Sequence, residues 1–417
     1  MIKKVFFTVL VLYSGIIYAQ KPNEKYPSPQ PLGFVMPNGY DKVTIPFEIY
    51  NNLIVIDVLL NRSLPLKFIL DTGVRTAVLT EKTLTDLLNL PYSRKITIPG
   101  AGGEKFVDAF VVNNVSLNVG RIEGNGHALL VLEEDLLQLK NYLGVSVHGI
   151  LGYELFSRFV VDLNYDKKII TFYDPRTYKK KRRFVEIPIV VEDTKPYLMA
   201  NLAIRESDTV RGKFMLDTGA SHTILLDERS GEEIYAPEPY ISSSLGRGLG
   251  GNIYGKVARI DRLWVDDYRF DGAVAIFPSP DNYEISLEHN FRHGTFGGGV
   301  MSRFRIVFDF VNQKLYVRKG GSYHKPFEFN LSGLVIRADG AYLNEFEIDN
   351  IREGSAAKKA GLKEGDKIIS INGVKTDKMN LDEVVGRLND KANKKMRLVV
   401  ERDNKHIHIQ FKLTRLI

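Results

Sequence analysis

Cysteine is missing from the whole sequence of 417 residues. Its absence excludes disulfide bonds, a thiol nucleophile, cysteine-ligated metals and a lipid-modified N-terminal cysteine. If the chain works outside the cytoplasm, packing without covalent cross-links has to stabilise it.

Nothing in the composition suggests a polytopic membrane protein, and the apolar stretch near the N-terminus is too short to favour a spanning helix. Lys3 and Lys4 precede this stretch at residues 5–13, and small residues follow at Gly15 and Ala19. That order predicts a secretory signal peptide at residues 1–20, with a retained N-terminal anchor as the alternative. We expect an exported protein, periplasmic or secreted, with no stable membrane insertion after signal cleavage.

The charge gives little support for a nucleic-acid partner, although the formal net charge is +7. The basic block at residues 179–183 is not interleaved with the aromatic residues that a stacking surface needs. We therefore interpret this block as a solvated connector, and we expect no nucleic-acid partner.

A repeat is the most informative feature that the sequence does contain. The segment at residues 67–73 reappears almost unchanged at 213–219, and each copy contains Asp-Thr-Gly. Such a match, in one order and at nearly constant offset, indicates duplication. The other matched landmarks are an Ile-Pro pair at 45–46 and 187–188, glycine clusters at 100–103 and 248–251, and a His-Gly pair at 148–149 and 293–294.

Most of both halves is predicted to be β-strand, because short β-branched and aromatic runs are bounded by Asn, Gly, Pro or Asp. The predicted strands lie at residues 53–60, 66–70, 106–112, 159–163, 169–173, 197–204, 213–216, 254–265 and 305–317, and the helices at 83–90 and 133–143. The predicted fold class is mainly β, with two pseudo-symmetric all-β lobes at 42–180 and 181–320. A flexible lead-in is expected at 21–41.

The pattern changes after residue 320. Ser355 is typical of a helix N-cap, and Gly361 is typical of a left-handed helix end. The further elements expected here are a strand at 366–371, a tight turn at 372–373, a helix at 381–388 and a strand ending near 413. They predict a separate α+β domain at residues 328–417.

Asp71 and Asp217 each follow an apolar strand, one in each copy of the repeat. Two carboxylates in contact do not both ionise readily, so one keeps its proton and the other stays charged. The charged member takes a proton from a water molecule, and the protonated member polarises a scissile carbonyl. We predict that the two form a catalytic pair that needs no cofactor and no metal. Two structural aspartates at turns are the alternative, and the better one for either copy alone.

The residues beside the two aspartates are expected to support them. Gly73 and Gly219 let the backbone turn sharply, and the hydroxyls of Thr72 and Thr218 can bond across the axis between the copies.

The two glycine clusters are interpreted as hairpin tips that close over a bound chain and then open. An extended peptide can pair its backbone with such hairpins, whereas an ordinary glycine-rich loop is the alternative. The predicted flap residues are Gly100, Gly102, Gly103, Gly248, Gly250 and Gly251.

With these motifs, the chain resembles a bacterial retropepsin-like aspartic peptidase of the two-lobed, pepsin-like kind, followed by a PDZ domain. The peptidase resemblance covers residues 30–320, and it implies that Asp71 and Asp217 are catalytic and that the glycine hairpins are flaps over a peptide cleft. The PDZ resemblance rests on the motifs at 354–357, 360–362, 365–368 and 371–373. It implies a groove that takes a polypeptide beside a helix and a strand.

Three features depart from the family patterns: Thr295 stands in place of an aliphatic residue in the second copy, and the other two concern Arg75 and the PDZ loop. Arg75 follows the first Asp-Thr-Gly, and if it pointed inward it would lower the pKa of Asp71; the alternative is a solvent-facing side chain. The carboxylate-binding loop of the PDZ groove is expected near residues 342–346, but no glycine-rich version stands there. An internal or intramolecular contact of the groove is therefore an equal alternative.

The sequence thus predicts an aspartic endopeptidase that acts on a protein or peptide in extended conformation, with a PDZ domain that recruits polypeptide. A non-catalytic peptide-binding scaffold of the cell envelope is one alternative. Pairing of each half with its twin in another chain is a second, which the direct tandem disfavours.

Overall fold

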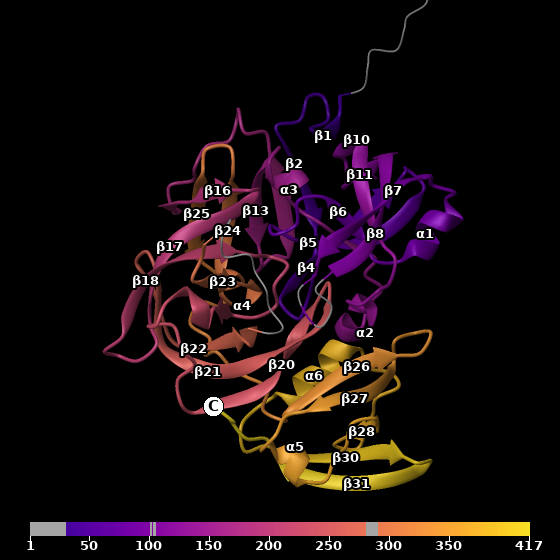
Figure 1. Cartoon of the computed structure of the whole chain (residues 1–417), viewed down its shortest axis with the longest axis vertical. Coiled ribbons are helices and arrows are strands. Elements are labelled where there is room, and N and C mark those ends of the chain that lie inside the picture. The colour runs from indigo at the N-terminus through magenta and orange to yellow at the C-terminus, as the bar shows by residue number, and fades with distance from the viewer. Residues whose placement is uncertain (1–30, 101, 103–105, 281–290) are drawn as a thin grey trace, which may run out of the picture. The chain divides into compact units, whose positions relative to one another are not determined.

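The computed structural model describes residues 31–100, 102, 106–280 and 291–417 (Figure 1). The predicted signal peptide at 1–20 and residues 21–30 of the lead-in at 21–41 lie outside the described residues. Inside the lead-in, β1 (Gly33–Val35) pairs with β10 (Glu123–Asn125), so this short part belongs to a sheet and is not a loose leader. In the part of the chain that is described, no helix is both long and apolar enough to cross a bilayer.

The first half forms a nine-stranded sheet around the strand that leads to Asp71. Along its main path the strands are β3 (Glu48–Tyr50), β4 (Leu53–Leu60), β5 (Leu64–Leu70), β12 (Gly149–Leu151), β6 (Ala77–Leu79), β11 (His127–Leu132), β8 (Phe106–Val115) and β7 (Tyr92–Pro99), and β9 (Leu117–Asn118) pairs with β4. The apolar runs at 53–56, 68–70 and 77–79 explain why the central strands are buried on both faces there, whereas Asp57 of β4 is exposed.

The second half forms an eight-stranded sheet with the same order of strands. Its strands are β16 (Val190–Glu192), β17 (Lys195–Ala203), β18 (Thr209–Leu216), β23 (Gly294–Phe296), β19 (Ile224–Leu226), β22 (Tyr268–Pro278), β21 (Gly251–Val265) and β20 (Tyr240–Gly248). In both sheets the third and fourth strands run parallel, as do the fifth and sixth, and the other neighbours run antiparallel. Apart from β9, the two sheets therefore match strand by strand.

A six-stranded sheet joins the halves. Its order is β15 (Val185–Pro188), β25 (Lys314–Lys319), β24 (Phe304–Asp309), β13 (Val160–Asn164), β14 (Ile169–Tyr173) and β2 (Lys42–Pro46). The central pair, β13 and β24, brings one strand from each half side by side with Val161 opposite Phe308. One hydrophobic core runs through both halves as a result.

Helices are short in this part of the protein. In its described residues they are α1 (Lys82–Leu87), α2 (Leu139–Leu143), α3 (Tyr153–Phe156) and α4 (Gly298–Met301), with a 3-10 turn η1 (Glu228–Ser230).

Two of the predicted elements are wrong in extent. The helix expected at 133–143 is reduced to α2, because Gln138 is left-handed with a φ of 49° and its N–H bonds the carboxylate of Asp135. The single strand expected at 305–317 is a hairpin of β24 and β25, which turns at Gln313 with a φ of 52°.

The C-terminal part has its own sheet and its own core, drawn in orange to yellow in Figure 1. Its strands follow the order β26 (Leu334–Asp339), β27 (Glu345–Ile351), β28 (Lys367–Ile371), β30 (Lys395–Arg402) and β31 (Lys405–Lys412), with β29 (Val374–Lys375) paired to β28. The helices are α5 (Ala356–Lys359) and α6 (Leu381–Leu388). Ser355 caps α5 and Asn380 caps α6 through their side chains. The prediction of a mainly β protein that ends in an α+β domain is confirmed.

Candidate active site

Asp71 and Asp217 both stand directly after the end of a buried central strand. β5 ends at Leu70, and β18 ends at Leu216. The N–H of Asp71 donates to the carbonyl of Leu151 at 2.9 Å, and the N–H of Asp217 donates to Phe296 at 2.9 Å. Because each parallel neighbour holds its aspartate in this way, the two backbones are fixed alike.

Thr72 and Thr218 join the two turns to each other. The hydroxyl of Thr72 accepts from the N–H of Thr218 at 3.1 Å and donates to the carbonyl of Leu216 at 2.6 Å. In return, the hydroxyl of Thr218 accepts from the N–H of Thr72 at 3.0 Å and donates to the carbonyl of Leu70 at 2.7 Å. Both threonines are buried, so this reciprocal set of bonds is protected from water.

The carboxyl groups of Asp71 and Asp217 lie side by side, because a Cβ atom at Gly73 would come within 3.4 Å of oxygens of both, and the two groups are close enough for Asp217 to raise the pKa of Asp71. Each carboxyl also accepts from the N–H of the glycine two positions on: Gly73 at 2.5 Å and Gly219 at 2.9 Å. Residues distant in the sequence, one from each half, thus share a single carboxyl pair within one chain.

The two glycines are required by lack of space rather than by a left-handed backbone. A Cβ atom at Gly219 would lie 2.2 Å from Cγ of Asp71. A Cβ atom at Gly73 would lie 3.0 Å from Oδ1 of Asp71 and 3.4 Å from both carboxyl oxygens of Asp217. Larger residues would therefore push the carboxyl groups apart, more severely at Gly219.

The protonation of the pair is biased by its surroundings. Burial raises the pKa of Asp71 well above its ordinary value, and the charge and hydrogen bond of Asp217 raise it further. The N–H of Gly73 and the charge of Lys195 act in the opposite direction. The pair therefore retains a proton at pH values where an isolated aspartate would be charged.

Arg75 does not take part in this balance. Its side chain is 73% exposed, and it lies 3.9 Å from the carboxylate of Asp193. The structure thus favours the solvent-facing alternative and not the inward one that would have lowered the pKa of Asp71.

His148 and His293 occupy equivalent places beneath the two turns. The Nδ1 atom of His148 accepts from the N–H of Lys67 at 3.2 Å, and that of His293 accepts from Lys213 at 3.1 Å. Burial lowers the pKa of both imidazoles. Each neutral ring accepts a hydrogen bond from a backbone N–H, of Lys67 in β5 or of Lys213 in β18, and this is a structural role.

The predicted flap glycines lie at the tips of two hairpins. The first glycine hairpin is β7–β8, with Gly100 directly after β7; the second is β20–β21, in which Gly248 pairs with Gly251. Gly250 lies in the turn between them, and Gly103 lies outside the described residues. The tips meet, because a Cβ atom at Gly102 would lie 2.4 Å from the carbonyl oxygen of Gly251.

Two residues near the pair were not assigned a site role from the sequence. The positive charge of Lys195, the first residue of β17, lowers the pKa of Asp71. This lysine could not be found from the sequence, because it belongs to no motif. Burial lowers the pKa of His222 to about 4. Its Nε2 atom has no hydrogen-bond partner among the described residues, so the ring is neutral at ordinary pH.

Across residues 31–100, 102, 106–280 and 291–417, no cluster of three or more His, Asp or Glu side chains is arranged to hold a metal ion.

Comparison with known proteins identifies two kinds of domain. A family model described as aspartyl protease matches residues 56–155, which include Asp71 but not Asp217, and a PDZ domain model matches residues 323–401. No curated protein matches the sequence. Among solved structures, the crystal structure of Basic 7S globulin from soybean matches at 10% identity, over 69% of this chain and 99% of that chain. Its TM-score of 0.39 is too low to support an argument. The chain therefore carries an aspartyl protease domain at residues 56–155 and a PDZ domain at residues 323–401.

Proposed function

We propose that this protein is an aspartic endopeptidase whose active site is the pair Asp71 and Asp217. The observation that carries the proposal is the contact between the two carboxyl groups, held by the reciprocal bonds of Thr72 and Thr218. A structural role alone would not need two carboxyl groups with one shared proton.

The mechanism follows from the charge of the pair. We assign the shared proton to Asp71, whose pKa is raised by burial and by its partner. Asp217 then takes a proton from a water molecule lying between the two groups, while Asp71 donates a hydrogen bond to the scissile carbonyl. The hydroxide adds to the carbonyl carbon, and protonation of the leaving nitrogen by the pair completes the cleavage. No covalent intermediate is required.

The substrate is a polypeptide in extended conformation. An extended chain can add its backbone to strand edges, and the two glycine hairpins meet at Gly102 and Gly251 with their tips together. We assign them the role of flaps, and the PDZ domain that of binding polypeptide. Export by a signal peptide, to the periplasm or the exterior, belongs to the same proposal.

The matched order and sense of strands in the two halves support an origin by internal duplication. This origin explains why one chain supplies both aspartates of a pseudo-symmetric pair.

The test is to replace each aspartate separately, by Asp71→Asn and Asp217→Asn. Each change should lower cleavage of a mixed peptide library by about 10³-fold or more, because each removes half of the acid–base pair. Product sequencing at several pH values measures the cleavage. The matched control is Asp57→Asn, whose side chain is 80% exposed on β4 of the same sheet. If either variant still cuts at the control rate, the shared pair is wrong; if the unmodified protein binds library peptides and cleaves none, the scaffold alternative is right.

A further inference from the structure

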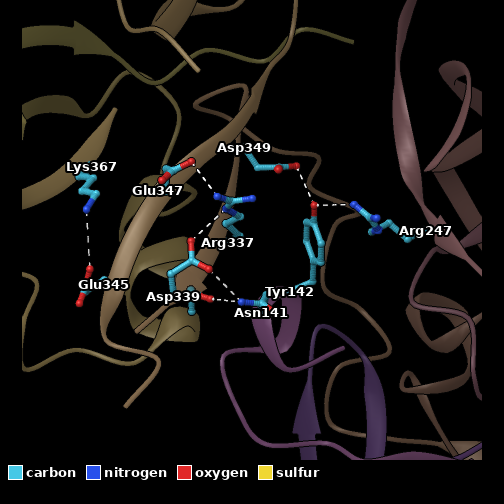
Figure 2. Close-up of polar contacts among 10 residues, drawn as sticks. Asn141, Tyr142, Arg247, Arg337, Asp339, Glu345, Glu347, Asp349 and Lys367 are labelled. Carbon is cyan, nitrogen blue, oxygen red and sulfur yellow. Dashed lines mark hydrogen bonds and ion pairs between the residues drawn. The ribbon is translucent and has the colours of Figure 1, made fainter. Parts of the chain in front are cut away.

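A segment of the protease part packs against the edge strand of the PDZ sheet. β26 is an edge strand in the described residues. Asn141, on α2, donates from its amide nitrogen to the carbonyl oxygen of Ala338 at 2.9 Å and to a carboxylate oxygen of Asp339 at 2.9 Å (Figure 2). α2 thus takes the backbone acceptor that an added strand would use.

The other end of α2 lies against the PDZ helix α6. Gly144 follows α2 in a left-handed conformation with a φ of 65°, and a Cβ atom there would lie 2.4 Å from Cβ of Leu381, the first residue of α6. The segment 139–144 therefore reaches both the strand and the helix between which a PDZ domain takes its ligand.

The same segment is bonded to the second glycine hairpin. Arg247, on β20, donates from Nη1 to the hydroxyl of Tyr142 at 3.1 Å and from Nε to the carbonyl of Leu136 at 3.0 Å. The hydroxyl of Tyr142 donates in turn to Asp349 of β27 at 3.0 Å (Figure 2). Tyr142 is thus a single point that joins the hairpin, α2 and the PDZ sheet, and we call these contacts the latch.

α2 fills the region only in part. A cavity of about 430 Å³ remains beside it, with apolar side chains that include Leu143 of the protease part and Leu334, Ile336 and Val385 of the PDZ domain. Arg352 also borders this cavity, and its Nε and Nη1 atoms are buried without a hydrogen-bond partner among the described residues. A desolvated guanidinium group beside apolar space favours an apolar ligand that carries a carboxylate.

We propose that α2 and an extended, carboxylate-bearing polypeptide compete for the edge of β26, and that displacement of α2 opens the latch and frees the second glycine hairpin. A strand added along β26 needs the carbonyl of Ala338, which Asn141 occupies, so the two cannot bind there together. Movement of α2 off this edge breaks the bond from Tyr142 to Asp349 and, in this proposal, the bond from Arg247 to Tyr142 with it. The PDZ domain then controls the proposed flap as well as holding polypeptide.

This inference rests on the proposed function only in assigning the hairpin to a cleft, since the competition itself requires no catalysis. By linkage, peptide binding at β26 and closure of the latch oppose each other by the same factor, so a change that weakens the docking of α2 on β26 should tighten peptide binding.

The first test measures binding in the Asp217→Asn protein, so that a peptide is not cleaved. The probe is a randomised decapeptide library with free carboxyl ends. The double variant Asn141→Ala and Tyr142→Phe should bind library peptides about tenfold more tightly than its parent, because the internal competitor is weakened. Gln410→Ala is the control: Gln410 is exposed on β31, at the opposite edge of the same sheet from β26, and this variant should bind like the parent. Equal affinity of the double variant and the control overturns the competition.

The second test measures amide hydrogen exchange in β20 and β21. Exchange at residues 240–256 should be roughly tenfold faster in the double variant, and in the parent saturated with a selected library peptide, than in the free parent. Exchange in β30 should stay unchanged, which shows that the PDZ core remains folded. Peptide binding that leaves the hairpin exchange unaltered overturns the coupling. A protein that cleaves no peptide but still shows the competition and the change in hairpin exchange would refute the peptidase proposal alone. Failure of the proposed function can therefore be told apart from failure of this inference.

Discussion

Val74 and Ala220 hold the same place in the two Asp-Thr-Gly turns, one residue after each glycine. The carbonyl of Val74 accepts from the N–H of Tyr153 at 3.0 Å, and the carbonyl of Ala220 accepts from Gly298 at 2.7 Å. The side chains differ in size, yet the backbone bonds are the same. The position of each aspartate is therefore set by the backbone of the neighbouring segment and tolerates a change of side chain.

The next residue of each turn, Arg75 or Ser221, contacts the other half of the protein. Arg75 of the first turn lies 3.9 Å from Asp193, in the β16–β17 turn of the second half. Its counterpart Ser221 accepts, at its carbonyl, from the side chain of Asn52 in the β3–β4 turn of the first half at 2.9 Å. Each half thus steadies the turn of the other, with an exposed ion pair on one side and a hydrogen bond on the other.

The largest expected difference between the turns concerns their glycines. Gly219→Ala should lower kcat/KM for library cleavage by roughly 10²-fold or more, because the new Cβ would meet the carboxyl carbon of Asp71. Gly73→Ala should lower it by only about tenfold, since its Cβ would stand 3.0 Å from the nearest oxygen. Steady-state kinetics on one cleaved library peptide would measure both. Equal losses would show that the geometric difference between the turns has no effect on the pair.

The threonines should behave alike. Thr72→Val and Thr218→Val each remove a buried hydroxyl that makes two bonds across the turns, so each should lower the free energy of unfolding by about 2–4 kcal/mol. The double variant should lose less than the sum, because the two hydroxyls serve one network. Urea denaturation measures all three. Thr97→Val, which removes an exposed hydroxyl bonded to Asp108, is the control, and a strong asymmetry between the two threonines would contradict the symmetry of the turns.

The smallest effect is on stability as a function of pH. The pKa of Asp71 is raised in the folded state, so the folded protein binds this proton more tightly than the unfolded chain does. The resulting contribution to the free energy of unfolding is complete below the ordinary pKa of 3.8 and is lost as the pH rises through the raised pKa. Asp71→Asn removes this titration. The variant should therefore be more stable than the parent at neutral pH, and the gap should close on acidification. Denaturation curves from pH 3 to pH 8 test this, and a gap that is constant over the range would mean that burial does not perturb Asp71.

The sequence by itself determined the repeat, the strands and the domain order, because these depend on local patterns. Runs such as 53–60 and 169–173 became β4 and β14 with the same bounds, and the predicted helix at 381–388 became α6, since alternation, capping residues and turn residues act over a few positions. The two aspartates were found in the same way, from a motif that occurs twice.

The tertiary structure alone decided what depends on contacts between distant segments. The outward direction of Arg75 and the effect of the charge of Lys195 on Asp71 have no local signal. The docking of α2 on β26 is a contact between residues about two hundred positions apart, recorded in the bond from Asn141 to Ala338. Local chemistry specifies each strand and turn, whereas the free energy of burying one surface against another selects which of them meet.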